Sequence, residues 1–198
     1  MRFLIAFVAI FGYAAGSPHP METRATNQIS TFQIVAFRPD SEIDSLKIKA
    51  ANNTLYIGPS TQDACCNQRN AEDAATFYLK SEELFLYSPG NPKQQIYVDN
   101  SRAGERNIRY YIGSQPQPQG AKTKGWEIRK DGALTFNDGQ LMACNNGANT
   151  WDVLLRSGDQ SAGSCKKCLE FTAKTSIIAS PTSCLYSGEH QVVSFHCL

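Results

Sequence analysis

The stretch that decides the fold covers residues 126–144 and reads WEIRKDGALTFNDGQLMAC. Apolar and polar residues alternate around two Asp-Gly pairs, Asp131-Gly132 and Asp138-Gly139. Alternation with a period of two is typical of a half-buried β-strand, because successive side chains point to opposite faces of the sheet. Asp-Gly between two such segments predicts a tight hairpin, since glycine accepts the positive φ that a primed turn needs. The stretch therefore predicts two consecutive β-hairpins.

The same arrangement occurs twice earlier in the chain, where alternating apolar segments flank Asn52-Asn53 and Ser81-Glu82-Glu83. Further short strands are expected over residues 32–37, 95–98, 108–112, 151–155 and 192–195. No window keeps a 3.6-residue apolar period over three turns, although residues 168–175 could form a short helix. We therefore predict an all-β fold, a disulfide-stabilised barrel or sandwich of short antiparallel strands, with room for a trefoil-like closure.

The start of the chain has the parts of a secretory signal peptide over residues 1–16. Arg2 precedes an apolar run, and the run ends in Ala14-Ala15-Gly16. The run is too short to span a membrane. We expect a flexible leader over residues 17–30 and a single all-β domain over residues 31–198. The protein is thus predicted to be secreted and extracellular.

The charge of the chain is balanced, with 19 Lys and Arg residues against 18 Asp and Glu residues. Loss of the signal peptide removes Arg2 and no acidic residue, which leaves no net charge. A nucleic-acid binder or a cationic membrane-active protein would need an excess of basic residues. We therefore expect neither nucleic acid nor a membrane as partner of the mature form.

The chain contains seven cysteines, all after the predicted signal peptide: Cys65, Cys66, Cys144, Cys165, Cys168, Cys184 and Cys197. Disulfides are the default state of cysteines in a secreted chain. Cys165 and Cys168 also have the spacing of a redox dithiol or of half a zinc site, but neither a βαβ pattern nor a second close Cys or His pair accompanies them. The spacing leaves the pairing open. Because seven is odd, one thiol stays unpaired within the chain, and Cys197 is the candidate for a bond to another chain.

A loop rich in glutamine and proline is expected over residues 113–125. Pro116 and Pro118 cannot donate to a β-ladder, so the segment should be exposed. Basic residues concentrate around it: Arg102, Arg106, Arg109, Lys122, Lys124, Arg129 and Lys130. They form either a solvated positive face or a contact for an anionic polymer.

The motifs of common catalytic sites are missing from the sequence. The three histidines, His19, His190 and His196, lie in the leader or near the C-terminus, and none forms a pair with metal-ligand spacing. There is no glycine-rich phosphate loop and no nucleophile elbow. We therefore predict a protein without enzymatic activity, metal or cofactor. A small glycan-active enzyme remains an alternative, since two carboxylates that meet in space need no motif.

Two further features bear on recognition outside the cell. Asn52-Asn53-Thr54 makes Asn52 a candidate N-glycosylation site on an expected turn. Trp126, Tyr110 and Tyr111 could stack on sugar faces, and the alternative for each is core packing. Because Tyr110 and Tyr111 are adjacent on a strand, one of them should face outward.

Gly-Ser-Gln-Pro-Gln-Pro at 113–118 followed by Gly125-Trp126 is a distinctive combination. With it, the chain resembles the PhiA-like cell wall proteins of filamentous fungi from about residue 32 to residue 186. Residues 75–79, 84–87, 95–99 and 141–144 add to it. The resemblance implies a secreted, non-catalytic wall protein linked to formation of phialides and conidia. Wall polysaccharide or wall proteins would be its partners.

The resemblance also bears on the cysteines. Cys144, Cys168, Cys184 and one of Cys65 and Cys66 fall on the family's cysteine positions, whereas the other three are additional. These extra cysteines leave a second function open, that of a secreted binding module or effector that recognises an external glycan or protein.

Overall fold

The computed structural model describes residues 29–68, 73–88, 90, 92–101, 106–147, 149–156 and 167–188. These residues contain fifteen β-strands and no helix, which confirms the all-β class. Accordingly, the described ranges hold no helix that could cross a membrane. The predicted signal peptide, most of the leader and the expected strand at 192–195 lie outside these ranges.

The strands are short, and most have between three and seven residues. In chain order they are β1 (Thr31–Phe37), β2 (Lys49–Ala51), β3 (Thr54–Ile57), β4 (Ala64–Cys66), β5 (Thr76–Lys80), β6 (Glu83–Leu86), β7 (Gln94–Asp99), β8 (Ile108–Ile112), β9 (Ala121–Lys122), β10 (Trp126–Ile128), β11 (Ala133–Phe136), β12 (Leu141–Gly147), β13 (Thr150–Leu155), β14 (Cys168–Ile177) and β15 (Cys184–Tyr186).

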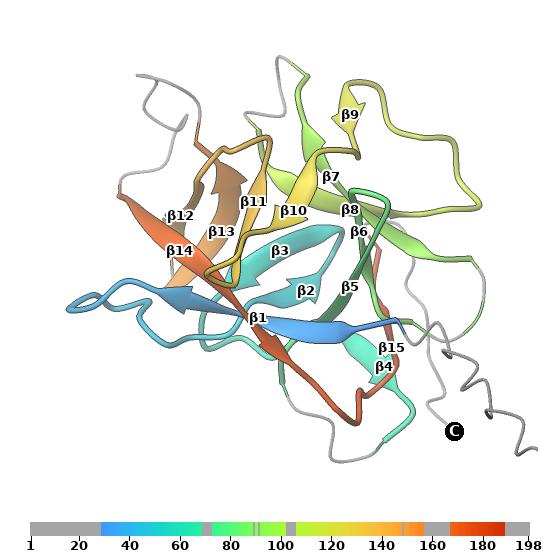
Figure 1. Ribbon diagram of the computed structural model, residues 1–198, viewed down its shortest axis with the longest axis horizontal. Helices are drawn as coiled ribbons and strands as arrows, with labels where there is room; N and C mark the ends of the chain where they lie inside the picture. The colour runs from blue at the N-terminus through green and yellow to red at the C-terminus, as the bar shows by residue number, and fades with distance from the viewer. Residues whose placement is uncertain are drawn as a thin grey trace, which may run out of the picture.

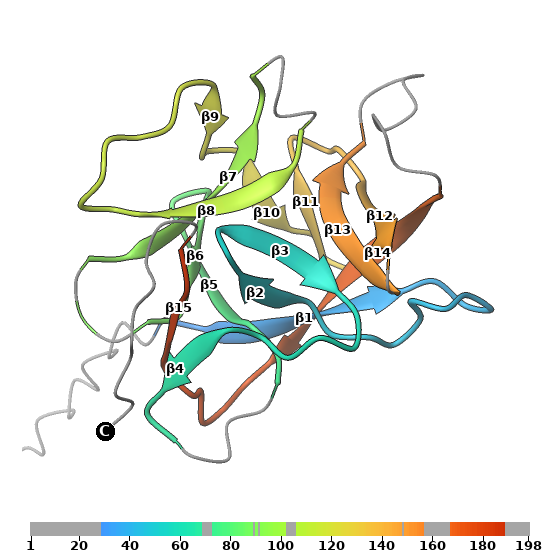
Figure 2. The ribbon, with the colours of Figure 1, turned by 180° about the vertical axis from the view of Figure 1, so that it is seen from behind.

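Nine of these strands pair in a ring. Hydrogen-bonded neighbours follow the order β1-β5-β6-β7-β8-β3-β13-β12-β14, and β14 pairs again with β1, where Phe32 lies opposite Ile177. Such closure removes open sheet edges, which favours the barrel over the sandwich. Hairpin β10–β11 extends from β14, while β2 and β9 pair with β3 and β7. Figures 1 and 2 show this arrangement from two sides, with β9 at the top and the separate β4–β15 pair at the bottom.

The expected hairpins around Asn52-Asn53, Ser81-Glu82 and Asp131-Gly132 are confirmed as β2–β3, β5–β6 and β10–β11. The expected hairpin around Asp138-Gly139 is wrong, because β11 and β12 both pair with β14 and not with each other. Asn137 and Asp138, with φ of 46° and 58°, still form a two-residue turn there. Phe136 bridges to Gly139, so the loop consists of Asn137 and Asp138, which tolerate the left-handed region.

The expected short helix at 168–175 is wrong, because these residues belong to β14, the longest strand. β14 pairs with β12 over its first half and with β1 and β11 over its second half. Ladder hydrogen bonds on both sides outweigh the weak helical pattern of the segment.

The core fills the ring with alternate side chains of its strands. Its largest fully buried members include Trp126, Trp151, Tyr110, Tyr186 and Phe77. The Trp126 ring packs edge-on against Phe136, with 5.0 Å between the ring centroids. Burial of such large aromatic side chains is the main source of stability of a domain this size.

A buried amide joins β15 to the ring. Gln94 on β7 is fully buried; its Nε2 donates to the carbonyl of Tyr186 over 2.7 Å, and its Oε1 accepts from the N–H of Tyr186 over 2.9 Å. The Tyr110 hydroxyl donates to the carbonyl of Ser187 over 2.5 Å. The Gln94 side chain thus pairs the backbone of Tyr186, while Cys184 N donates to the carbonyl of Tyr87 over 3.1 Å.

Candidate functional site

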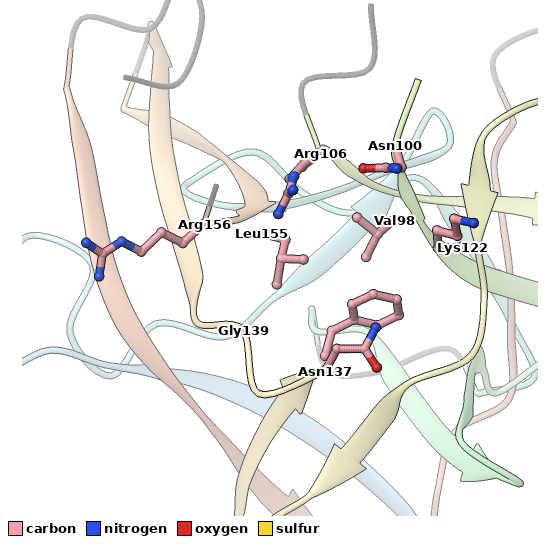
Figure 3. A pocket seen from close by; sticks show the side chains of 9 residues that line it. Val98, Asn100, Arg106, Lys122, Asn137, Gly139, Leu155 and Arg156 are labelled. Atoms are coloured by element: carbon pink, nitrogen blue, oxygen red, sulfur yellow. The ribbon is translucent and has the colours of Figure 1, made fainter. Parts of the chain in front are cut away.

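A pocket of about 410 Å³ lies where the ends of β7 and β13 meet the β11–β12 turn and β9 (Figure 3). Three apolar side chains form its floor: Val98 from β7, Phe136 from β11 and Leu155 from β13. They are only 2%, 4% and 7% exposed, so the floor is part of the core. The volume lies within the roughly 300–1,000 Å³ typical of small-ligand sites.

Backbone hydrogen bonds fix the segments around the pocket. Arg106 N donates to Asp99 O and Leu155 N donates to Arg106 O, each over 3.0 Å. Lys122 lies opposite Val98 in the β7–β9 ladder. The side chains of the rim therefore start from backbone positions that are already ordered, which lowers the cost of binding a ligand.

The rim of the pocket is basic. Arg106, Lys122 and Arg156 line it, and no acidic residue of the described ranges does. Arg156 is engaged elsewhere, because its Nε lies 3.0 Å from Oε1 of Glu170, and Figure 3 shows it pointing away from the other side chains. Within the described part of the chain, the side chains of Arg106 and Lys122 form neither an ion pair nor a hydrogen bond. Two cations are thus available to an anion beside a low-dielectric floor, where their attraction is screened less than in open water.

Two amides complete the rim, those of Asn100 and Asn137. Gly125 makes room for the second: a Cβ at this position would lie 2.2 Å from Oδ1 of Asn137, and its φ of +119° is strained for other residues. Asn137 N also donates to Gly125 O over 2.8 Å. Each amide offers two N–H donors and a carbonyl acceptor, which suits recognition of hydroxyl groups.

The expected sugar contacts of Trp126, Tyr110 and Tyr111 need correction. Their exposed fractions are 1%, 0% and 8%, so none presents a ring face to a ligand. Both tyrosines are inside, although alternation predicted that one would face outward. Tyr110 belongs to the main core, whereas Tyr111 packs on Tyr97 in a small second cluster and donates to Oε1 of Gln95. The core alternative is the one that the structure supports.

Trp126 nevertheless bears on the pocket, because it packs against Phe136 of the floor. Gly125 and Trp126 therefore shape the pocket without lining it. Glycine leaves space for the Asn137 side chain, and the tryptophan supports the floor.

The predicted basic cluster divides in the structure. Arg106 and Lys122 line the pocket, whereas Arg129 pairs over 3.1 Å with Asp138 of the β11–β12 turn. Arg102 lies outside the described residues. Sequence reasoning missed Arg156, Asn137 and Leu155 as site residues. No motif marks them, because only closure of the ring brings the end of β13 beside β7.

The Gln-Pro loop is exposed over residues 113–120 apart from partly covered Pro118. The expectation that it extends to residue 125 is wrong in part. Ala121–Lys122 forms β9 on β7, and Lys124 bridges to Glu83. This pairing is what brings Lys122 to the pocket.

Two disulfides join described residues, Cys66–Cys184 and Cys144–Cys168. Cys65 is also disulfide-bonded, and its partner lies outside the described residues. Because Cys168 is bonded to Cys144, the spacing of Cys165 and Cys168 does not mark a redox dithiol. Cys165 and Cys197 lie outside the described ranges, so the proposed interchain bond of Cys197 stays a prediction.

The described residues also bear on a possible metal site and on the glycosylation acceptor. Among the described residues no group of three or more His, Cys, Asp or Glu residues could hold a metal ion, and all three histidines lie outside those residues. Asn52 is exposed on the β2–β3 turn, as expected for a glycosylation acceptor.

Comparison with known proteins establishes the family. The sequence profile of the PhiA-like secreted proteins matches residues 32–187. The chain belongs to the PhiA-like secreted protein family. No solved structure matches the chain.

Named relatives of this family cover nearly the whole chain. The chain is 31% identical to the cell wall protein phiA of Aspergillus fumigatus over 157 residues, which are 79% of this chain and 84% of that protein. It is 31% identical to the cell wall protein phiA of Aspergillus niger over 181 residues, 90% of this chain and 96% of that protein. For the cell wall protein phiA of Arthroderma benhamiae the identity is 28% over 194 residues, 94% of this chain and 98% of that protein.

Membership of the PhiA-like family confirms that this is a secreted protein of the cell wall. The two disulfides between described residues use Cys144, Cys168, Cys184 and Cys66.

Proposed function

We propose that this PhiA-like protein is a non-catalytic component of the fungal cell wall that supports asexual development, in the formation of phialides and conidia. The observation that carries the proposal is the family match over residues 32–187, joined to relatives that are named cell wall proteins. The match includes almost the whole described fold, so the resemblance is not confined to one motif.

The fold supports a role that depends on persistence outside the cell. Each of the nine ring strands has a hydrogen-bonded neighbour on both sides, so the free edges that could pair with another chain are limited to short strands such as β2, β9 and β10. The disulfides Cys66–Cys184 and Cys144–Cys168 restrict the unfolded chain. A compact domain of this kind should survive long residence in a wall exposed to proteases.

The pocket supports binding rather than catalysis. In the part of the chain that the structure describes, its rim consists of cations and amides, with no carboxylate or histidine. Glycoside hydrolysis needs a pair of carboxylic groups, one of them as proton donor. Contact with wall polysaccharide or with another wall protein is therefore the function that we propose for this protein.

The test of wall residence is the distribution of the mature protein between culture medium and purified walls. Walls are extracted with salt, then detergent, then thiol reductant. We expect the protein in the wall after the salt step. Release only by reductant, abolished in the Cys197→Ser variant, would assign retention to an interchain disulfide. Recovery of nearly all protein from the medium would overturn the wall function.

The developmental part of the proposal needs its own experiment. A strain that lacks the gene should form fewer conidia and malformed phialides, and the wild-type gene should restore both. Normal conidia and phialides in the deletion strain would overturn this part and leave wall residence intact.

A second candidate function is recognition of an external partner by a protein that leaves the wall. The basic pocket favours it, since Arg106 and Lys122 at its rim have no counter-ion among the described residues and could bind an anionic group. The fractionation above separates the two functions.

A further inference from the structure

We propose that the pocket between β7, β9 and β13 binds an acidic sugar residue of a polysaccharide, with Arg106 and Lys122 holding its carboxylate. The proposal goes beyond wall residence, because it names a site and the chemical class of ligand. It rests on the proposed function only for the source of the polysaccharide.

The positive charge of the pocket favours an anionic ligand. Among the described residues, three cations and no acidic residue line the pocket. Glu170 pairs with Arg156. Of the three cations that line the pocket, Arg106 and Lys122 therefore have no counter-ion among the described residues. Arg106 offers a planar fork that matches a carboxylate, and Lys122 adds a flexible point charge.

The apolar floor of the pocket favours a ligand that has an apolar face. Val98, Phe136 and Leu155 form the bottom, and a free inorganic anion would gain nothing from them. A pyranose ring presents C–H groups on its faces and hydroxyls at its edge. The amides of Asn100 and Asn137 stand at the rim, where they can bond those hydroxyls.

The side-chain positions in Figure 3 fit a ligand whose carboxylate binds the cations and whose ring lies on the apolar floor. Arg106 reaches down toward Leu155 and Val98, with Asn100 beside it, while Lys122 and Arg156 stand on opposite sides. An acidic sugar that lies on the floor would thus meet a guanidinium directly. Because the backbone around the site is hydrogen-bonded, little ordering is needed on binding.

The test measures binding of trigalacturonate to the purified full-length mature protein by titration calorimetry. The matched control ligand is the methyl ester of the same trisaccharide, which keeps the rings and removes the charge. We expect the acid to bind and the ester to bind roughly tenfold more weakly or not at all, as loss of a charge-assisted hydrogen bond requires. Equal binding of acid and ester, or no binding of either, would overturn the proposal.

A pair of variants locates the site. Arg106→Gln with Lys122→Gln should weaken binding of the acid by about tenfold or more. The control, Lys80→Gln with Lys130→Gln, removes the same charge from two exposed lysines outside the pocket and should bind like the wild type. An equal loss of trigalacturonate binding in both double variants would show that net charge alone attracts the ligand, and it would refute the site. Thermal unfolding of each variant confirms that it is folded.

These outcomes are independent of wall residence. Binding is measured with purified protein, so its failure leaves the fractionation result unchanged. Conversely, a protein found only in the medium that still binds trigalacturonate would refute the wall function and keep the pocket.

Discussion

The amide of Gln94 offers the sharpest test of the packing that holds β15 to the ring. The side chain is fully buried and forms two hydrogen bonds with the backbone of Tyr186, one as donor and one as acceptor. Gln94→Leu removes both partners, which leaves a buried N–H and a buried carbonyl unpaired. At about 1–3 kcal/mol for each group, we expect a loss of about 2–6 kcal/mol in the free energy of unfolding, at any pH.

The free energy of unfolding of Gln94→Glu, unlike that of Gln94→Leu, should depend on pH. A protonated glutamic acid can donate to the carbonyl of Tyr186 and accept from its N–H, so it restores both bonds. The ionised form accepts only, and it is buried. Burial therefore raises the pKa of the introduced carboxyl in the folded state above the unfolded value of about 4.3.

The sign of the pH effect follows from proton binding. Above about pH 4.3 the folded variant holds more protons than the unfolded one, so its stability falls as pH rises, by about 1.36 kcal/mol per pH unit. If the folded pKa is 7 or higher, the loss between pH 4.3 and pH 7 is about 3.7 kcal/mol.

The assay is denaturant unfolding of wild type, Gln94→Leu and Gln94→Glu between pH 4 and pH 8. The difference between Gln94→Glu and wild type should grow with pH, whereas the difference for Gln94→Leu should stay constant. A flat difference for Gln94→Glu, or wild-type stability of Gln94→Leu, would refute the assigned contact.

Three further predictions follow from the core and the cross-links. Replacing both Cys144 and Cys168 by serine opens a bond that spans 24 residues and should cost about 3 kcal/mol, read from the denaturant midpoint; an unchanged midpoint would contradict the assigned pair. Trp126→Ala should cost about 3–5 kcal/mol and Trp126→Phe clearly less, because the ring is buried against Phe136; equal urea midpoints for both variants would speak against this packing. Burial raises the pKa of Tyr56 and Tyr186 to about 12, with Asp73 and Asp63 adding to the effect on Tyr56. Between pH 10 and pH 12 the folded state thus holds more protons than the unfolded state, so stability should fall as pH rises. Tyr56→Phe should flatten that decline in unfolding curves at pH 9, 10 and 11, and an unchanged decline would exclude the contribution of Tyr56.

Local features of the fold were accessible from the sequence. Asn52-Asn53 and Ser81-Glu82 turn where alternation on both sides predicted hairpins, because two-residue loops and period-two patterns are local properties. The exposed Asn52 was found in the same way. In contrast, the turn at Asn137 was misplaced by one residue, since three successive residues there are all good turn formers.

The pocket was not accessible in this way. Lys122 and Arg106 stood out as charges near a proline-rich loop, but their convergence with Leu155 depends on which strands pair. That information lies in contacts between distant parts of the chain, such as Phe32 with Ile177. The burial of Trp126 and Tyr110 likewise depends on closure, because an alternating strand pattern does not say which face becomes the inside.

The pairing of β1 with β14 has a consequence for the order of events in folding. The first described strand cannot complete its ladder until a strand more than a hundred residues later is available. Until then, both partners expose an unpaired edge, which is the feature through which β-chains aggregate. Contacts of such high sequence separation also make folding slow. This PhiA-like protein should therefore depend on chaperones and on oxidation of its cysteines during secretion, and variants that slow closure should be lost before they reach the wall.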